Sequence, residues 1–282
     1  PKLGDGESLI SFLRAHNAEP ALQRILCHHG RCLHGVDGDR CPLNLNAMVM
    51  GALYQSAHML ADGGDALVSA FERRLRAEGV DVCTGQAVQR LVVDDQRRLR
   101  GVCLANGTLL ECTECVSTIH PQLLLGLLPP HAVRPAFVKR VCSMENTFGL
   151  LVVYVATESP PPSLARSNHY YLSDQPAERP DDGELLTTCW GTHDGSQKPI
   201  CLLRPYACVQ RAAGDAVPDA SATRERYEAE LAGMLAQFYR LHPEQRGRSQ
   251  VLATAVPDTF EAYTGTVAGS AYGLKHTTTL PG

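Results

Sequence analysis

The chain has 282 residues, of which 44% are hydrophobic and 20% are charged, and its formal net charge is −4. This apolar content is sufficient for a sizeable core and at most two domains. The charge balance lacks the basic footprint of nucleic-acid-binding proteins, so we expect no nucleic-acid partner. The sequence begins with Pro1, and no charged and then apolar leader follows. We therefore expect a piece of a longer protein, with no secretory signal in the part given.

The longest apolar runs cover residues 123–128 and 149–156. Both are far shorter than the roughly 18 to 20 residues that cross a bilayer, so they predict buried strands or helices. The 11 cysteines follow no regular spacing, whereas disulfide scaffolds belong mostly to short secreted domains. This favours reduced cysteines in a cytoplasmic protein, and a peripheral contact with a membrane stays open.

The first 62 residues are predicted to be mainly helical, with short apolar patches in a rather polar sequence. Within them, the segment 46–60 carries apolar residues on nearly every face, which predicts a buried helix. The pair Gly63-Gly64 then interrupts the pattern.

Residues 66–78 show the clearest helical pattern. Leu67, Phe71 and Leu75 recur every fourth residue, while charged side chains occupy the other faces. This spacing is typical of an amphipathic helix with one buried stripe. Gly79 is expected to end the helix, because glycine adopts a left-handed conformation at little cost.

From residue 80 onward the pattern changes to short strands, which are expected at 80–84, 88–93, 99–104 and 109–119. Asn106-Gly107 lies between the last two, and this pair favours a tight hairpin because both residues tolerate positive φ. We expect this β-unit to pack on the preceding helix.

The second half of the chain predicts an antiparallel sheet of at least four strands. The strands are expected at 147–156, 185–191, 200–207 and 250–256. Before the last of them, residues 224–241 show an amphipathic helical pattern, which Ser221 or Thr223 is expected to cap. The whole pattern predicts a mixed α/β fold.

One cluster near the N-terminus contains the residue types that bind metals: Cys27, His28, His29, Cys32, His34 and Cys41. It lacks the paired C-x2–4-C and H-x3–5-H spacing of zinc sites, so we expect no metal there.

Cys112 and Cys115 have the spacing of a redox pair. They fall on an expected strand, however, and not at a helix N-terminus, where a thiolate would be stabilised. Structural cysteines are the simpler interpretation.

Two blocks of sequence carry a family resemblance. The first, residues 62–121, reads DGGDALVSAFERRLRAEGVDVCTGQAVQRLVVDDQRRLRGVCLANGTLLECTECVSTIHP, and the second, residues 256–274, reads VPDTFEAYTGTVAGSAYGL. In this order they resemble the FAD-dependent phytoene desaturase, carotenoid isomerase and retinol saturase branch of the flavin amine-oxidase superfamily. The family's G-x-G-x-x-G fingerprint, which holds the pyrophosphate at a helix N-terminus, does not occur in this sequence.

The resemblance implies an α/β (α+β) fold with an FAD/NAD(P)-binding-type β-unit and a substrate domain built on an antiparallel sheet plus helices. It implies a helical part of the substrate domain at 1–62 and a partial FAD-binding domain at 63–121. The sheet of the substrate domain would cover 122–260, and residues 261–282 would return toward the FAD domain.

The resemblance also implies cofactor-binding positions. Gly63 and Gly64 would lie near the flavin, the backbone of Val88 would lie beside the adenine, and Thr118 and His120 would approach the phosphates or ribose. The simpler alternatives stay open at this point, since the glycines also suit an ordinary turn and Val88 also suits a strand core.

Tyr272 and Gly273 are the positions that the resemblance implies for the substrate site, and His276 could line it with them. The sequence shows neither a Ser-His-Asp arrangement nor paired carboxylates. The catalytic residues are therefore unknown, as expected where a flavin carries the hydride and the protein positions the reactants.

The function implied by the resemblance is hydride transfer at FAD on a hydrophobic polyene, and the direction of the reaction stays open. Two alternatives share the superfamily: an amine-oxidising relative, and a non-catalytic prenyl- or lipid-binding protein resembling the Rab GDP-dissociation inhibitors. Because the glycine-rich phosphate loop is absent, we expect this chain by itself to hold FAD weakly or not at all and to have no turnover.

Overall fold

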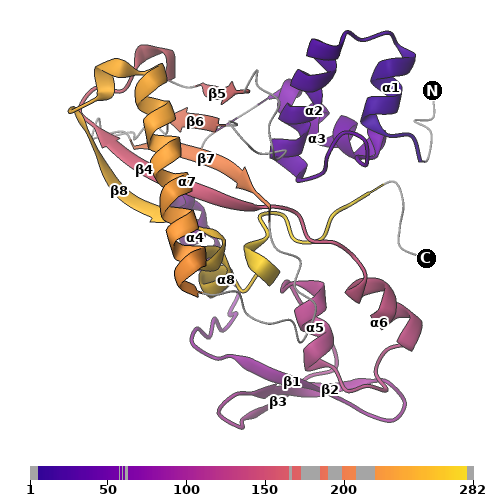
Figure 1. Ribbon diagram of the computed structural model, residues 1–282. Helices are drawn as coiled ribbons and strands as arrows, with labels where there is room; N and C mark the ends of the chain where they lie inside the picture. The colour runs from indigo at the N-terminus through magenta and orange to yellow at the C-terminus, as the bar shows by residue number, and fades with distance from the viewer. Residues whose placement is uncertain are drawn as a thin grey trace.

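The computed structural model describes residues 6–56, 58, 60, 63–164, 167–172, 185–189, 199–207 and 220–277. These residues form a helical lobe, a three-stranded sheet and a five-stranded sheet with helices (Figure 1). Both sheets are antiparallel. The expected mixed α/β fold is confirmed.

The helical lobe consists of α1 (Leu9–Ala15), α2 (Pro20–His34) and α3 (Leu43–Gln55). The Ser8 side chain caps α1 by accepting a hydrogen bond from the Ser11 amide. Pro20 stands at the start of α2, where its missing N–H costs nothing, and Gly35 ends the helix with a left-handed φ of 73°. A small core holds the lobe together, made of Leu9, Leu13, Val36, Cys41 and Leu43.

The expectation that residues 46–60 form a buried helix is wrong. The helix ends at Gln55, and Met48 and Tyr54 are 66% and 68% exposed. Within the described lobe, the buried residues of α3 are Leu43 and Met50, so apolar sequence on every face does not lead to burial of the whole helix here. Residues 57 and 59 lie outside the described part of the chain.

Helix α4 (Gly63–Ala77) forms where the periodicity predicts it, and Gly79 ends it with a φ of 71°. None of its residues is buried, however. Leu67 and Phe71 on the predicted stripe are 47% and 61% exposed. The expected packing of the β-unit on this helix is therefore wrong, and helix α5 (Pro121–Leu127) packs on that sheet through β1 (Val88–Val93) instead.

The three-stranded sheet continues with β2 (Leu99–Leu104) and β3 (Leu109–Glu111), in the order β1-β2-β3. Its turns follow the predicted chemistry: Asp94 accepts hydrogen bonds from the amides of Gln96 and Arg98, and Gly107 takes a φ of 87°. The predicted strand 80–84 is wrong, because no strand forms there, and the third strand ends at Glu111, well short of residue 119. Helix α6 (Pro135–Cys142) then packs beside α5.

The five-stranded sheet has the order β5-β6-β7-β4-β8. Its strands are β4 (Gly149–Thr157), β5 (Asn168–Tyr171), β6 (Leu185–Cys189), β7 (Ile200–Tyr206) and β8 (Ser249–Ala255). The prediction of at least four antiparallel strands is confirmed. β5 was not predicted, and the last two residues of the predicted strand 185–191 lie outside the described residues.

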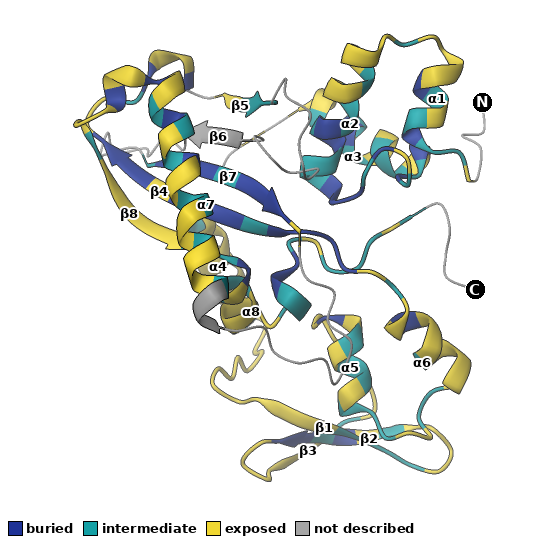
Figure 2. Ribbon diagram, viewed as in Figure 1, coloured by how far each residue is buried: buried dark blue, intermediate teal, exposed yellow. Residues whose placement is uncertain are grey.

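Helix α7 (Ala220–Leu241) lies across one face of this sheet (Figure 1). The alternate residues Leu151, Val153 and Val155 of β4 pack against Met234 and Phe238 of α7, because every second side chain of a strand points to the same face. Figure 2 shows the result, with β4 and β7 mostly buried, whereas in the three-stranded sheet only β2 has buried residues.

The expected caps of α7 are wrong. The helix begins at Ala220, so Ser221 and Thr223 lie inside it. Its sheet-facing side also carries an ion pair, between Arg204 of β7 and Glu230 at 3.1 Å. After α7 come the short 3-10 helix η2 (Pro243–Gln245), β8, helix α8 (Pro257–Thr264) and the 3-10 turn η3 (Val267–Gly269). An earlier 3-10 turn, η1 (Pro162–Leu164), follows β4.

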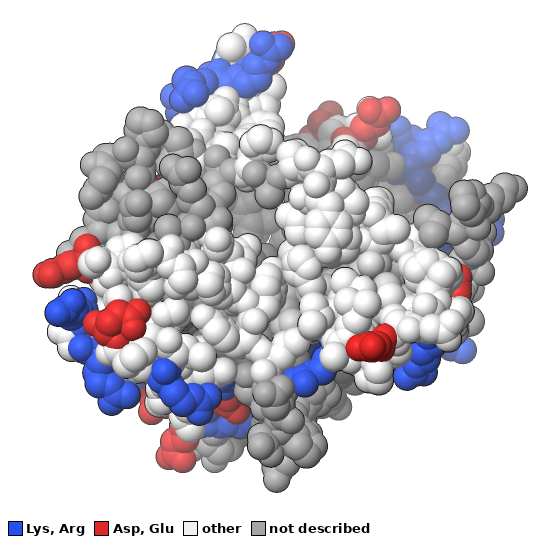
Figure 3. Space-filling model, turned by 90° about the horizontal axis from the view of Figure 1, so that it is seen from above, with Lys and Arg blue, Asp and Glu red and all other residues white. Residues whose placement is uncertain are grey.

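Charged side chains on the face drawn in Figure 3 lie mostly toward its edge, with both signs intermixed around a broad uncharged area. Among the described residues on that face, charges of one sign do not form an extended patch. The expected lack of a nucleic-acid partner stays a prediction.

Candidate functional site

Three segments that are far apart in the sequence meet directly before β4. Residues 145–148 pair with residues 271–275 through hydrogen bonds from the Thr147 amide to the Gly273 carbonyl and from the Lys275 amide to the Glu145 carbonyl, both 2.8 Å long. The loop after α2 approaches from the other side. We call residues 145–148, residues 271–275, His120 and Gly35 the junction.

His120 is buried in the junction, and both of its ring nitrogens have partners. Its Nε2 lies 2.8 Å from Oδ1 of Asn146, and its Nδ1 lies 3.3 Å from the Gln122 amide nitrogen. The amide can only donate, so Nδ1 accepts and Nε2–H donates to the Asn146 oxygen. His120 thereby caps α5 and ties it to the segment before β4.

Tyr272 ties the junction to the helical lobe. Its hydroxyl donates to the Cys32 carbonyl at 2.6 Å, and its amide donates to Oγ1 of Thr147 at 3.0 Å. Its ring meets Phe148 edge to face, at 5.9 Å between centroids. Burial raises the pKa of the Tyr272 phenol, so the hydroxyl stays protonated near neutral pH and keeps its role as a donor.

Gly35 and Gly273 allow the segments of the junction to approach each other closely, for different reasons. A Cβ added to Gly35 would lie 2.6 Å from Cγ2 of Thr147 and 2.9 Å from Cδ2 of Tyr272. A Cβ on Gly273 would reach only an ordinary 3.8 Å contact with His120, and there the positive φ of 69° is what favours glycine.

Glu145 lies at the solvent-exposed edge of the junction. Its two carboxylate oxygens accept from Arg40 at 2.8 and 3.0 Å, and one also accepts from Lys275 at 3.3 Å. Hydrogen bonds from Arg40 are the main reason why the pKa of Glu145 is lowered. One side chain therefore joins the helical lobe, the start of β4 and the returning C-terminal segment.

The structure brings together three of the residues predicted for the site, His120, Tyr272 and Gly273. The sequence reasoning missed Asn146 and Thr147, which connect them. The only sequence signal for the missed pair is its position as two polar residues directly before the apolar run of β4.

The remaining predicted residues lie elsewhere. Gly63 and Gly64 begin α4, and a Cβ added to either would meet nothing within 4 Å. Val88 pairs with Leu104 in the three-stranded sheet and is 39% exposed, and Thr118 is exposed in the segment before α5. These four positions lie in α4, in β1 and before α5, and the FAD contacts implied for them stay a prediction.

His34 and Cys41 of the helical lobe form a polar cluster with Asn46. His34 Nδ1 accepts from the Val36 amide, and its Nε2 lies 3.4 Å from both Asn46 Oδ1 and Cys41 Sγ. Burial lowers the pKa of His34 and raises the pKa of Cys41 to about 11. Across the described residues, no three His, Cys, Asp or Glu side chains gather as metal ligands would.

The two cysteines with the spacing of a redox pair do not lie on the expected strand. Cys112 follows the last residue of β3, and Cys115 lies exposed in the segment beyond it. Both are free thiols outside regular secondary structure, so the expectation that they lie on a strand is wrong.

Comparisons with known proteins show a distant relative by sequence and a likeness to solved structures. No family model matches the chain. Over 124 residues, 43% of its length, the chain is 30% identical to a rat protein named pyridine nucleotide-disulfide oxidoreductase domain-containing protein 2, and it spans 21% of that protein. The crystal structure of a Rab GDI from Plasmodium falciparum matches 80% of this chain and 48% of its own, with 14% identity and a TM-score of 0.38.

The similarity to the rat protein is distant, and that protein is named for an oxidoreductase domain. Within the described residues, every helix is too short or too polar to span a membrane.

Proposed function

We propose that the chain is part of a flavin-dependent oxidoreductase that acts on a hydrophobic, polyene-like substrate. The observation that carries this proposal is the meeting of the two family-like blocks. His120 lies near the end of the first block, Gly273 lies near the end of the second, and Asn146 and Thr147 join them. The similarity to a protein named for an oxidoreductase domain supports the same class.

The proposed roles follow from the position of each residue. Tyr272 and Gly273 would lie beside the substrate, and His120 would act as a positioning residue because both of its nitrogens are engaged in holding α5 and Asn146. Gly63, Gly64, Val88 and Thr118 would contact FAD only together with further elements of the parent protein.

FAD, when bound, would supply the hydride chemistry at the flavin. The protein described here would orient an apolar substrate and keep water from it. A peripheral contact with a membrane belongs to the same proposal, since a polyene resides in lipid.

The experiment is a visible spectrum of the purified parent protein, followed by anaerobic incubation with a carotenoid or retinoid. Two outcomes support the proposal. Either the polyene bleaches the spectrum of bound oxidised flavin, or it restores the oxidised spectrum of flavin that has first been reduced. A parent protein without flavin that binds prenylated peptides would overturn it and favour the non-catalytic alternative. Flavin that responds only to amines would favour an amine oxidase.

A further inference from the structure

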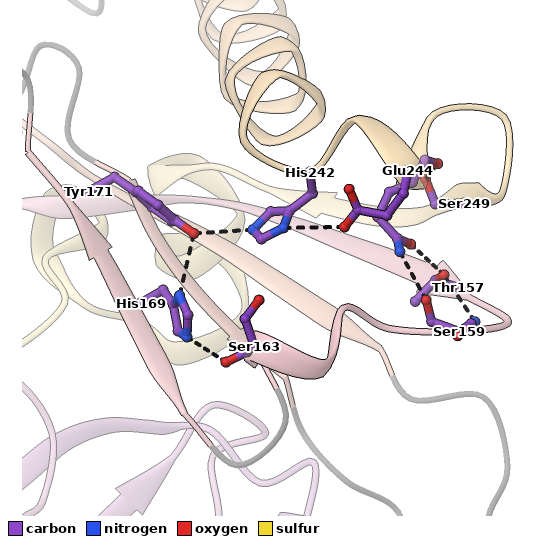
Figure 4. Close-up of polar contacts among 9 residues, drawn as sticks. Thr157, Ser159, Ser163, His169, Tyr171, His242, Glu244 and Ser249 are labelled. Atoms are coloured by element: carbon purple, nitrogen blue, oxygen red, sulfur yellow. Dashed lines mark hydrogen bonds and ion pairs between the residues drawn. The ribbon is translucent and has the colours of Figure 1, made fainter.

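The five-stranded sheet has two edge strands, β5 and β8 (Figure 1). An edge strand presents unpaired N–H and C=O groups, which invite another strand unless the edge is short, charged or covered. β5 is short, with four residues, and its two tyrosines contact other elements. The Tyr170 ring lies 4.9 Å from the His29 ring of α2, and the Tyr171 hydroxyl lies 3.1 Å from Nε2 of His242, which follows α7 (Figure 4).

Strand β8 lacks these protections. It has seven residues, Ser249–Ala255, and its sequence SQVLATA contains neither a charged residue nor a proline. It pairs with β4, so every second residue directs its N–H and C=O away from the sheet. Within the described residues, no further backbone hydrogen bond reaches these groups. Residues 250–254 are all exposed, and the exposed fraction of Leu252 is 58%.

The free edge of β8 is held in place by a buried polar network at its start. Thr157, at the end of β4, donates its hydroxyl to Oε1 of Gln245 at 2.6 Å, and Nε2 of Gln245 donates to the Ser159 carbonyl at 2.9 Å (Figure 4). The Ser249 hydroxyl donates to the Gln245 carbonyl at 3.0 Å. Gln245 itself is only 3% exposed. The edge is therefore ordered before any partner arrives, which lowers the entropy cost of binding.

A bulge divides β8 into two similar halves. Tyr154 of β4 pairs with Ala253 and the next residue, Val155, pairs with Val251, so Leu252 is the extra residue. Residues 249–251 and 253–255 remain paired with β4 on either side of it. A two-fold axis at Leu252 would place the first half of one strand opposite the second half of an identical strand. Such an isologous contact uses the same surface twice and closes at a dimer.

The charges that flank β8 favour the same antiparallel arrangement. Arg246 and Arg248 precede the strand, Asp258 and Glu261 follow it in α8, and all four are exposed. Arg246 lies six residues before Leu252, and Asp258 lies six residues after it. Two antiparallel copies would therefore bring the basic end of each strand to the acidic end of the other. A parallel pair would bring like charges together, which is unfavourable.

We propose that β8 is a self-association surface, on which two copies of this chain pair their β8 strands antiparallel around a two-fold axis at Leu252. The two five-stranded sheets then form one continuous sheet, and the exposed side chains of Val251 and Leu252 lie in the contact. The paired area is small beside the roughly 800 Å² per partner of a standard interface, so we expect a Kd on the order of 10 μM. This inference does not depend on a flavin.

The test is sedimentation velocity of the full chain at about 1 μM and about 200 μM, on either side of the expected Kd. We expect the mass to rise from 30.6 kDa toward twice this value. Leu252→Lys places two ammonium groups at the axis and should weaken the dimer at least about tenfold. The matched control is Leu110→Lys, at a 52% exposed position on the edge strand β3 of the other sheet, and should leave the Kd unchanged.

The proposed orientation has its own test by charge reversal. Arg246→Asp should weaken the dimer about fivefold, because each copy then places an acidic residue opposite Asp258. Adding Asp258→Arg to the same chain restores opposite charges across the axis and should recover the affinity. Failure of the second substitution to recover it would contradict the register centred on Leu252.

A chain that stays monomeric at about 200 μM would overturn the proposal, and so would a dimer that Leu252→Lys leaves intact. If circular dichroism shows that this variant does not fold, hydrogen exchange of the wild type decides. Protection of the amides of residues 249–255 should increase between about 1 μM and about 200 μM, while that of residues 109–111 stays the same. A dimer without this increase would place the contact elsewhere and sink the idea.

Discussion

Gly35 and Gly79 both adopt a left-handed backbone, with φ values of 73° and 71°, but only Gly35 is surrounded by other atoms. Glycine is therefore favoured at these two positions for different reasons. At Gly79 the backbone conformation alone favours glycine, whereas at Gly35 the contact with Thr147 and Tyr272 excludes a side chain.

Gly35→Ala is expected to lower the free energy of unfolding by about 2 to 4 kcal/mol, because it adds a clash in the junction to the cost of a left-handed alanine. Gly79→Ala, the matched control, is expected to cost about 1 kcal/mol. Urea unfolding of both variants measures the difference. Equal losses would mean that the junction is not closely packed at Gly35.

His120→Ala removes a cap from α5 and the hydrogen bond from His120 to Oδ1 of Asn146, so we expect a loss of about 2 to 3 kcal/mol. The control His131→Ala changes an exposed histidine and should lie within about 0.5 kcal/mol of the wild type. Both are measured by urea unfolding of the chain without added FAD. An unchanged stability of His120→Ala would remove its role as a positioning residue.

At the scale of elements, two helices whose sequences both predict an apolar stripe have different surroundings. α7 buries Phe238 and Met234 completely against the five-stranded sheet, while α4 leaves Leu67 and Phe71 exposed. Burial of such a stripe depends on the element that covers it, which the helix's own sequence does not specify.

This contrast gives a matched pair of substitutions. Phe238→Ala is expected to destabilise the chain by about 3 to 5 kcal/mol, because it leaves a cavity in the core. Phe71→Ala, at a side chain that is 61% exposed, is expected to change stability by no more than about 0.5 kcal/mol. Thermal or urea unfolding tests both, and a large loss for Phe71→Ala would show that α4 is covered in solution.

On the scale of the whole molecule, three histidines, two in α2 and one after α7, share one property. Burial lowers the pKa of His29, His34 and His242. The folded chain therefore binds fewer protons than the unfolded chain, in which these histidines titrate at about 6.5. Their contribution to stability is fully present above this pH and is lost as the pH falls through the lowered values.

We expect the urea midpoint of unfolding to stay constant between about pH 8 and pH 7 and to fall between about pH 6.5 and pH 5. The lowered pKa values of Asp94 and Glu145 act in a separate, more acidic window near their unfolded values of about 4. A midpoint that stays flat down to about pH 5 would contradict the role of the histidines.

The sequence by itself determined the elements whose signals are local. The turn at Asn106-Gly107, the end of α4 at Gly79, and the strands β1, β2, β4 and β7 follow from turn residues and apolar periodicity that lie within a few positions of each other. The two family-like blocks also contain His120, Tyr272 and Gly273, so the sequence was enough to single out these three residues.

Only the tertiary structure determined which distant residues these elements contact. It showed that Asn146 and Thr147 join the ends of the two blocks, that residues 80–84 form no strand, and that β5 is held between histidines of α2 and of the segment after α7. The physical reason is that burial, strand pairing and pKa depend on atoms contributed from distant parts of the chain. A residue's own neighbours in sequence carry little information about those atoms.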